Sequence, residues 1–134
     1  MAITTQDSFV GDGVTTLFSF TFPYIAEEDV KVSLDLVDLD STEYSFANAT
    51  TVSLTTPPAN GVAVLIYRDT NSDTPVNTFF PGSSIRAKDL NDNFTQSLYL
   101  NQEVKDRGYV LTSPDGTEYR LQVENGGTLT VVAI

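Results

Sequence analysis

The sequence predicts a mainly β protein with one long helix: a β-sandwich-like N-terminal domain, a helix of about 20 residues, and a small C-terminal β meander. Three observations predict this class. Short segments of alternating apolar and polar residues, separated by turn residues, fill the first 80 positions. The next part of the chain has a long stretch with helical periodicity and no proline or glycine. The last part holds two strong turn signals between short apolar segments.

The first two predicted strands have period-two alternation. Residues 17–22 place Phe18, Phe20 and Phe22 on one side of a strand, which Pro23 ends by removing a hydrogen-bond donor. Residues 30–36 alternate in the same way, and we expect four of their side chains to point inward: Val30, Val32, Leu34 and Leu36.

Two further strands are predicted before residue 80. Residues 51–54 form a short alternating segment. Residues 62–68 are nearly continuously apolar, which is typical of a strand buried on both faces. Several short strands separated by turn residues predict a compact β-sandwich or a rolled sheet.

A helix is predicted over residues 88–107, after Pro81 and Gly82 end the β region. Gly108 fits the position just past the helix C-terminus, and basic residues occupy the last turn, where they suit the helix dipole. The apolar stripe of this helix consists of Leu90, Phe94 and Leu98, flanked by Ser97, Asn101 and Val104.

The C-terminal residues predict a three-stranded meander over 109–112, 117–123 and 128–134. Such a meander is too small to hold a core of its own. We expect it to pack on the helix, on the first domain or on another subunit. The predicted division is therefore a β-rich domain over 1–80, a linker and helix over 81–107, and the meander over 108–134.

Composition excludes several classes of function. The 134 residues hold 7 Lys and Arg against 18 Asp and Glu, a net charge of −11, which disfavours nucleic acid and anionic membrane as partners. The chain contains no Cys and no His, so thiolate and imidazole metal sites, cysteine nucleophiles and Ser-His-Asp arrangements are absent. We therefore expect no enzyme activity, no cofactor and no metal.

The N-terminus has no cationic segment and no apolar run, and no stretch reaches the length of a membrane span. This pattern predicts a soluble, uncleaved protein made in a cytoplasm.

Two acidic motifs are weak candidates for cation binding. Residues 69–73 have the spacing of a calcium loop, but Thr74 and Phe80 stand where such a loop needs glycine and glutamate. Four further acidic residues form either a solvated loop or a site for a cation or a basic partner: Asp35, Asp38, Asp40 and Glu43.

The helix allows two interpretations. Its stripe either packs on the β-domain of its own chain or meets symmetry mates in a short bundle. In a bundle, Asn101 lies near the axis, where a polar residue can fix register and oligomer number. Phe79 and Phe80, before Pro81, are either core residues or an exposed docking pair.

An ordered set of segments resembles a known family. Residues 79–91, with Ser83, Arg86 and Asp89 in the pattern G-S-x-x-R-A-x-D-L-N, resemble a segment of the tail-fibre proteins of T-seven-like short-tailed phages, the podoviruses. Upstream, residues 18–25, 43–54 and 61–70 resemble further segments of that family in the same order. The resemblance covers about residues 9–107.

The resemblance implies a virion structural protein of the phage tail. In this family the region is the virion-proximal domain of the fibre, which trimerises and docks on the tail where the adaptor and nozzle proteins meet. The chain ends at Ile134 without the long shaft and tip of the family. We therefore expect a short fibre or fibre adaptor, which can carry a separate fibre or tailspike protein on residues 109–134.

The resemblance also directs attention to two sets of residues. For docking on the tail we select the helix entry and the preceding aromatic pair: Phe79, Phe80, Ile85, Arg86, Asp89 and Asn91. Arg86 is the leading candidate because a guanidinium gives bidentate contacts, although it can equally cap the helix or pair with Asp89. For trimer contacts we select Leu90, Phe94, Leu98, Asn101 and Val104.

Two other classes of function stay open at this stage. The first is a carbohydrate-binding or receptor-binding β module of a phage tail, which presents Tyr24, Tyr67, Tyr109 or Tyr119 to sugar. The second is a glycan hydrolase, which needs two carboxylates about 5–9 Å apart in a cleft.

Overall fold

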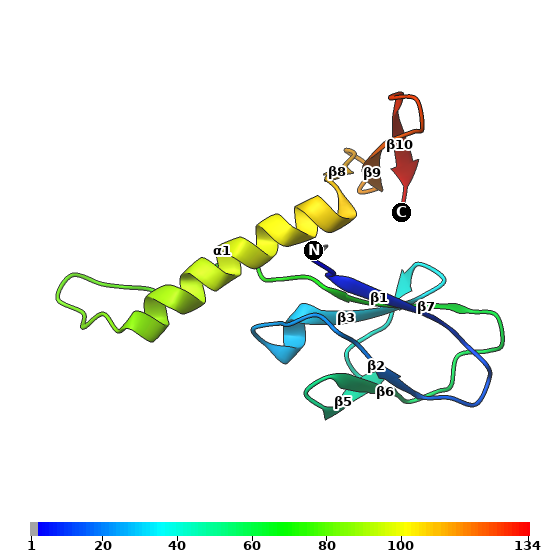
Figure 1. The fold of residues 1–134 in the computed structure, drawn as a ribbon, viewed down its shortest axis with the longest axis horizontal. Helices are drawn as coiled ribbons and strands as arrows, with labels where there is room; N and C mark the ends of the chain where they lie inside the picture. The colour runs from blue at the N-terminus through cyan, green and yellow to red at the C-terminus, as the bar shows by residue number, and fades with distance from the viewer. Residues whose placement is uncertain (1–2) are drawn as a thin grey trace.

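The computed structural model describes residues 3–134 and confirms a mostly β fold with one long helix (Figure 1). The elements in chain order are β1 (Gln6–Val10), β2 (Leu17–Ser19), the 3-10 turn η1 (Glu27–Asp29), β3 (Val30–Leu34), β4 (Val37–Asp38), β5 (Tyr44–Asn48), β6 (Thr51–Leu54), β7 (Ala63–Arg68), α1 (Ala87–Arg107), β8 (Val110–Thr112), β9 (Glu118–Val123) and β10 (Leu129–Ala133).

Two antiparallel sheets form the N-terminal sandwich. The first sheet has the strand order β1-β7-β3-β4, and the second has the order β2-β6-β5. Apolar side chains from both sheets meet between them and exclude water, which is the main source of stability for such a fold. The buried core consists of Phe18, Phe20, Phe22, Val30, Val32, Val52, Leu54, Val64 and Ile66.

The alternation in residues 17–22 is correct, although the strand is shorter than predicted. β2 ends at Ser19, yet Phe20 and Phe22 are still buried in the core, with their rings stacked at a centroid distance of 4.8 Å. The alternation of buried and exposed side chains thus continues beyond the end of β2, where the Phe20 amide still donates to the Thr50 carbonyl at 2.9 Å.

Leu36 corrects one prediction. β3 ends at Leu34, and Asp35 and Leu36 have positive φ angles of 48° and 69°. Two successive positive φ values are typical of a tight hairpin turn, here leading into β4. Leu36 is therefore exposed at the turn rather than inward.

β7 corrects a second prediction, because it is fully buried on one face alone. Val64, Ile66 and Arg68 are buried, while Leu65 and Tyr67 on the other face are half-buried. Within residues 3–134, the second sheet covers the inner face, whereas Leu65 and Tyr67 on the outer face line the groove beside the meander.

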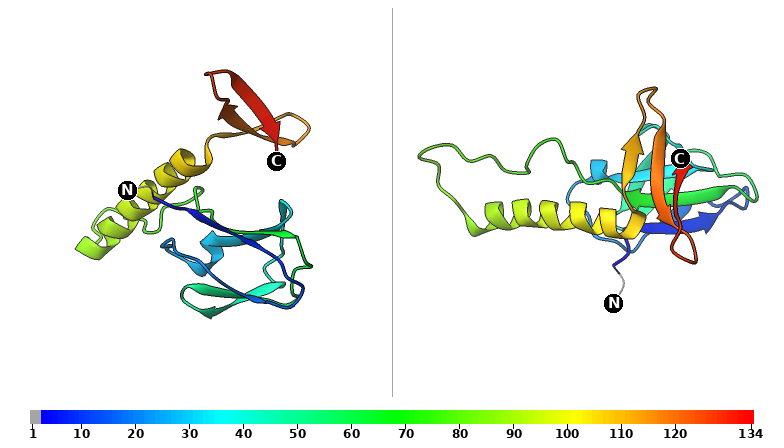
Figure 2. Two further views of the ribbon diagram at one scale, coloured as in Figure 1. Left: turned by 45° about the vertical axis from the view of Figure 1, so that its right-hand side comes forward. Right: turned by 90° about the horizontal axis from the view of Figure 1, so that it is seen from above.

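α1 and the meander lie on one side of the sandwich (Figures 1 and 2). The helix begins one residue before its predicted start and ends as predicted at Arg107, where the Gly108 amide donates to the Val104 carbonyl. Gly108 has a φ of 81°, which favours glycine at this position. The predicted meander forms a separate antiparallel sheet of order β10-β9-β8. Within residues 3–134, no helix is both long enough and apolar enough to cross a bilayer.

Candidate interaction surfaces

The side of α1 that faces the rest of the chain is polar. Its buried residues are Asp89, Gln96 and Glu103, spaced seven apart. At about 100° per residue, a spacing of seven keeps side chains nearly in line along a helix. The helix therefore packs on its own chain largely through hydrogen bonds and ion pairs.

Arg68, at the end of β7, is the centre of this packing. Its side chain is fully buried, and its Nε donates to Glu103 Oε1 at 2.8 Å. The remaining nitrogens donate to the Pro23 carbonyl at 2.7 Å and to Gln102 Oε1 at 2.9 Å. The guanidinium also lies 3.9 Å from the ring centroid of Tyr99. This paired and hydrogen-bonded arginine joins the β-sandwich to the middle of the helix.

Sequence reasoning did not single out Arg68 or Glu103. The alternation of side chains in β7 indicates part of this arrangement, because Arg68 follows Val64 and Ile66 on the inward side of the strand. A buried arginine needs a carboxylate partner, so an acidic residue elsewhere in the chain could have been expected. Nothing local in the sequence identifies Glu103, which lies 35 positions away.

Residues 71–77 run beside the helix and are held by two of its amide side chains. Asn93 accepts from the Asn77 amide at 2.8 Å and donates to the Asn77 carbonyl at 2.9 Å. Gln96 accepts from the Val76 amide and donates to the carbonyls of Asn71 and Thr74. These side chains satisfy backbone groups of a segment that belongs to no sheet.

The C-terminal end of the helix is fixed in the same way. Asp106 Oδ2 accepts from the backbone amide of Thr5 at 2.8 Å and from its hydroxyl at 2.7 Å. Arg107 donates to the Arg68 carbonyl, and its guanidinium lies 4.9 Å from the ring centroid of Tyr67. Contacts at the middle and at both ends hold the polar side of α1 against its own chain.

The opposite side of α1 is apolar and open to solvent. Phe94 is 66% exposed and Leu98 is 54% exposed. At about 100° per residue, these positions lie roughly opposite Gln96 and Glu103. We call this surface the apolar helix face, which consists of Leu90, Phe94, Leu98, Asn101 and Val104. The structure thus places four of the five residues selected for trimer contacts on this exposed side of α1, whereas Val104, 38% exposed, lies at its edge and lines the groove toward the meander.

The residues selected for docking lie at the helix entry, but they are not equally accessible. Phe80 is 67% exposed, Ile85 and Asn91 are also exposed, and Phe79 is half-buried. A turn positions the pair: the Ser83 amide donates to the Phe80 carbonyl at 2.9 Å. Pro81 and Gly82, whose φ is 86°, suit the two central positions of that turn.

Arg86 and Asp89 form an ion pair across the first turn of α1. Arg86 Nε and Nη2 donate to the two Asp89 oxygens at 3.0 and 2.9 Å. These hydrogen bonds lower the pKa of Asp89 below its ordinary value. Asp89 is buried, whereas the Arg86 side chain keeps 76% of its surface exposed. Asp89 therefore orients Arg86, and the guanidinium is the group that a partner can reach.

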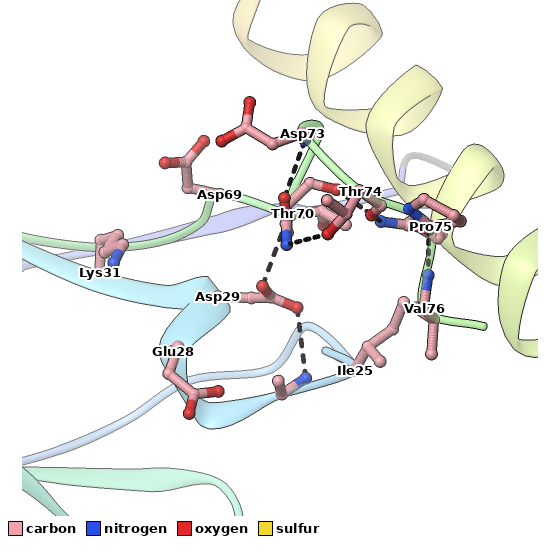
Figure 3. Close-up of a pocket in the computed structure, with 13 residues that line it drawn as sticks. Ile25, Glu28, Asp29, Lys31, Asp69, Thr70, Asp73, Thr74, Pro75 and Val76 are labelled. Carbon is pink, nitrogen blue, oxygen red and sulfur yellow. Dashed lines mark hydrogen bonds between the residues drawn. The ribbon is translucent and has the colours of Figure 1, made fainter. Parts of the chain in front are cut away.

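A polar cavity lies between η1 and the segment after β7 (Figure 3). Asp29 accepts there from the Ala26 amide at 3.2 Å and from the Asn71 amide at 3.4 Å. Burial raises the pKa of Asp69, which lies across the cavity. Among residues 3–134, no three acidic side chains converge as metal ligands do, so the calcium-loop spacing of 69–73 gains no support.

The second acidic motif is used in local structure. Asp38 accepts from the Tyr67 hydroxyl at 2.8 Å, and Asp35 accepts from the Ala63 amide at 2.8 Å. Asp40 accepts from Thr42, and its own amide donates to Glu43. Each of the four carboxylates therefore has a hydrogen-bond partner within its own chain.

Two of the tyrosines proposed for sugar binding, Tyr67 and Tyr109, line one groove between the sandwich and the C-terminal sheet, and the other two lie elsewhere. The Tyr24 ring packs on Phe20 and Phe46 in the sandwich. Tyr67 is half-buried, Tyr109 is exposed, and Tyr119 lies in the separate C-terminal sheet. The four tyrosines therefore do not share a single surface, and the sugar-binding interpretation stays a prediction.

A β-rich domain joined by polar contacts to a helix with an exposed apolar face is typical of a structural component of a larger assembly. The comparisons with known proteins give the same class. The family model described as the phage T7 tail fibre protein, N-terminal domain, matches residues 1–124. The tail fiber protein of Escherichia phage T7 is 36% identical over 102 residues, which cover 71% of this chain and 18% of that protein. The tail fiber protein of Enterobacteria phage T3 is 35% identical over 102 residues, with the same coverage.

The chain belongs to the family of phage T7 tail fibre N-terminal domains. It is a structural protein of the phage tail and is located in the virion tail. The chain spans about a fifth of the length of the curated relatives that it matches.

Proposed function

We propose that this chain anchors a fibre to the phage tail as a homotrimer, with the apolar helix face at the three-fold axis and the helix entry docked on the adaptor and nozzle proteins. The observation that carries the proposal is the orientation of α1. The helix uses its polar side for its own chain and leaves its apolar side exposed. An exposed apolar stripe along a helix is typical of a surface that another helix covers.

The pattern of the apolar helix face supports a parallel helical bundle. Leu90, Phe94, Asn101 and Val104 recur at spacings of three, four and seven, which suits side chains that face a common axis. Asn101 lies within the apolar row, where a polar residue can fix register and oligomer number at some cost in stability. Three copies place the three sandwiches outside the bundle, because each polar helix side already holds its own sandwich.

The helix entry supports docking on a protein partner. Phe80 and Ile85 are exposed apolar side chains on either side of the Pro81 turn, and Arg86 stands beside them. Asp89 holds the Arg86 guanidinium in one orientation, so little side-chain freedom is lost when a partner binds it. An apolar pair with an oriented arginine is typical of the central part of a protein interface.

The same proposal assigns no catalysis and no cofactor to this chain. It has no histidine or cysteine, and several of its acidic residues serve turns and ion pairs in the described structure. That residues 109–134 carry a separate fibre or tailspike protein stays a prediction.

Light scattering of the purified protein tests the trimer. We expect a mass of about three chains for the wild type and a lower mass for Phe94→Asp and Leu98→Asp, because a charge buried at the axis is strongly unfavourable. Lys88→Asp is the matched control, since it changes the net charge by two outside the apolar helix face. A wild-type monomer with an intact helix by circular dichroism refutes the trimer.

Binding to purified tail adaptor and nozzle proteins tests docking. Arg86→Ala and Phe80→Ser are expected to weaken capture of these proteins without changing the oligomeric mass. Val37→Ser, an exposed apolar residue in the sandwich, is the control. Full capture by both variants refutes the assignment of the docking surface.

A further inference from the structure

The C-terminal meander has two chemically different faces. Cross-strand pairing places Leu111 beside Tyr119, Leu121 beside Val131, and Val123 beside Leu129. Because side chains alternate along a strand, these residues share one side of the sheet. We call this side the apolar meander face, which consists of Leu111, Tyr119, Leu121, Val123, Leu129, Val131 and Ala133.

The other side of the meander faces the sandwich. Glu118, Arg120, Gln122 and Val132 line a groove of about 840 Å³ together with residues of the first sheet and of the end of α1. The charged residues of β9 therefore point toward the sandwich, and the apolar meander face points away from it.

The apolar meander face is open to solvent in a single chain. Val131 is 59% exposed, and Val123 and Leu129 are at least as exposed. A contiguous apolar face exposed to water is typical of a surface that another layer covers. The described structure provides no such layer, since the sandwich and α1 lie on the groove side.

Charge and chain geometry favour further copies of this chain as the covering layer. The chain carries a net charge of −11, so copies associate best through surfaces without charge. The apolar meander face and the apolar helix face both meet this condition. Val104 on the helix and Leu111 on the meander are seven residues apart, so a helix at an axis holds its meander close to the same axis.

We propose that three copies pack their apolar meander faces against one another, forming a three-sided β prism that continues the helical bundle along its axis. This inference rests on the trimer proposed above. It adds a second contact between copies, after the helix, that is made by residues of the C-terminal sheet. The prism also explains why the meander needs no close packing on the sandwich of its own chain.

Single-cysteine cross-linking of the full chain tests the prism. The chain has no cysteine, so Val131→Cys and Val132→Cys each introduce one thiol. These neighbouring valines have the same native side chain and lie on opposite faces of β10, with exposures of 59% and 42%. With a short bis-maleimide reagent, Val131→Cys is expected to place up to roughly two thirds of the chains in covalent dimers, since one thiol per copy links two of three. For Val132→Cys, we expect only the low fraction of covalent dimers that random collisions in dilute solution produce.

A second pair protects the test against a variant that folds poorly. Leu129→Cys and Thr130→Cys are also adjacent and on opposite faces of β10. We expect dimers for Leu129→Cys and background for Thr130→Cys.

Light scattering of the same samples separates the two proposals. A wild-type trimer in which Val131→Cys and Leu129→Cys cross-link no better than their neighbours overturns the prism and leaves the helical trimer intact. Such a result also leaves the apolar meander face to a different protein. A monomeric wild type overturns both proposals.

Discussion

The buried pair of Arg68 and Glu103 gives the sharpest test of how the helix is held. Glu103→Gln keeps the shape of the side chain but removes its charge. The Arg68 guanidinium is fully buried and loses its carboxylate partner, and the Thr70 amide and hydroxyl lose a charged acceptor. Removing one partner of a buried ion pair costs about 3–5 kcal/mol. For a chain of this size, a loss of about 3 kcal/mol lowers the Tm by about 10 °C.

The assay is thermal and urea unfolding followed by circular dichroism, at one protein concentration because oligomer stability depends on concentration. A double-mutant cycle with Arg68→Met isolates the interaction, and we expect a coupling of about 2–3 kcal/mol. Asp92→Asn is the control, since it breaks the exposed pair with Lys88 and is expected to cost at most about 0.5 kcal/mol. A coupling no larger than the effect of that control refutes the role of the buried pair.

Three further predictions concern the helix end, the segment beside the helix and the sheet. Gly108→Ala is expected to lower stability by about 1–2 kcal/mol in the same unfolding assay, because φ is 81° and a Cβ meets the Leu121 carbonyl at 3.3 Å. Gln96→Leu removes the acceptor of the Val76 amide, so hydrogen exchange of that amide is expected to accelerate while core strands keep their protection. Burial raises the pKa of Tyr67, so the folded state keeps a proton that the unfolded state loses, and stability is expected to fall as the pH rises above about 10. Absorbance titration of Tyr67→Phe and of the wild type checks this prediction. If the variant lacks a tyrosine that titrates at the ordinary pKa in the wild type, the prediction is contradicted.

Local signals were sufficient for much of the fold. The three alternating phenylalanines reach the core, the helix ends at the predicted glycine, and the meander has the predicted three strands. Each of these features depends on residues that are close in sequence. The prediction that Leu36 points inward was wrong, because alternation cannot reveal a turn that depends on two positive φ angles. β1 was not identified, since its apolar residues are few and its partner β7 is distant in sequence, and β5 was missed although it pairs with the neighbouring β6.

The candidate surfaces were predictable in their residues but not in their exposure. The sequence by itself determined that α1 has an apolar row from Leu90 to Val104 and that this chain resembles tail-fibre domains. It left undecided whether that row packs on its own sandwich. The tertiary structure decided this point, because Arg68 is buried and needs Glu103, which turns the polar side of the helix inward. The apolar row is left outside for a physical reason: a buried charge must find its partner, whereas an apolar surface can be covered by any copy that reaches it.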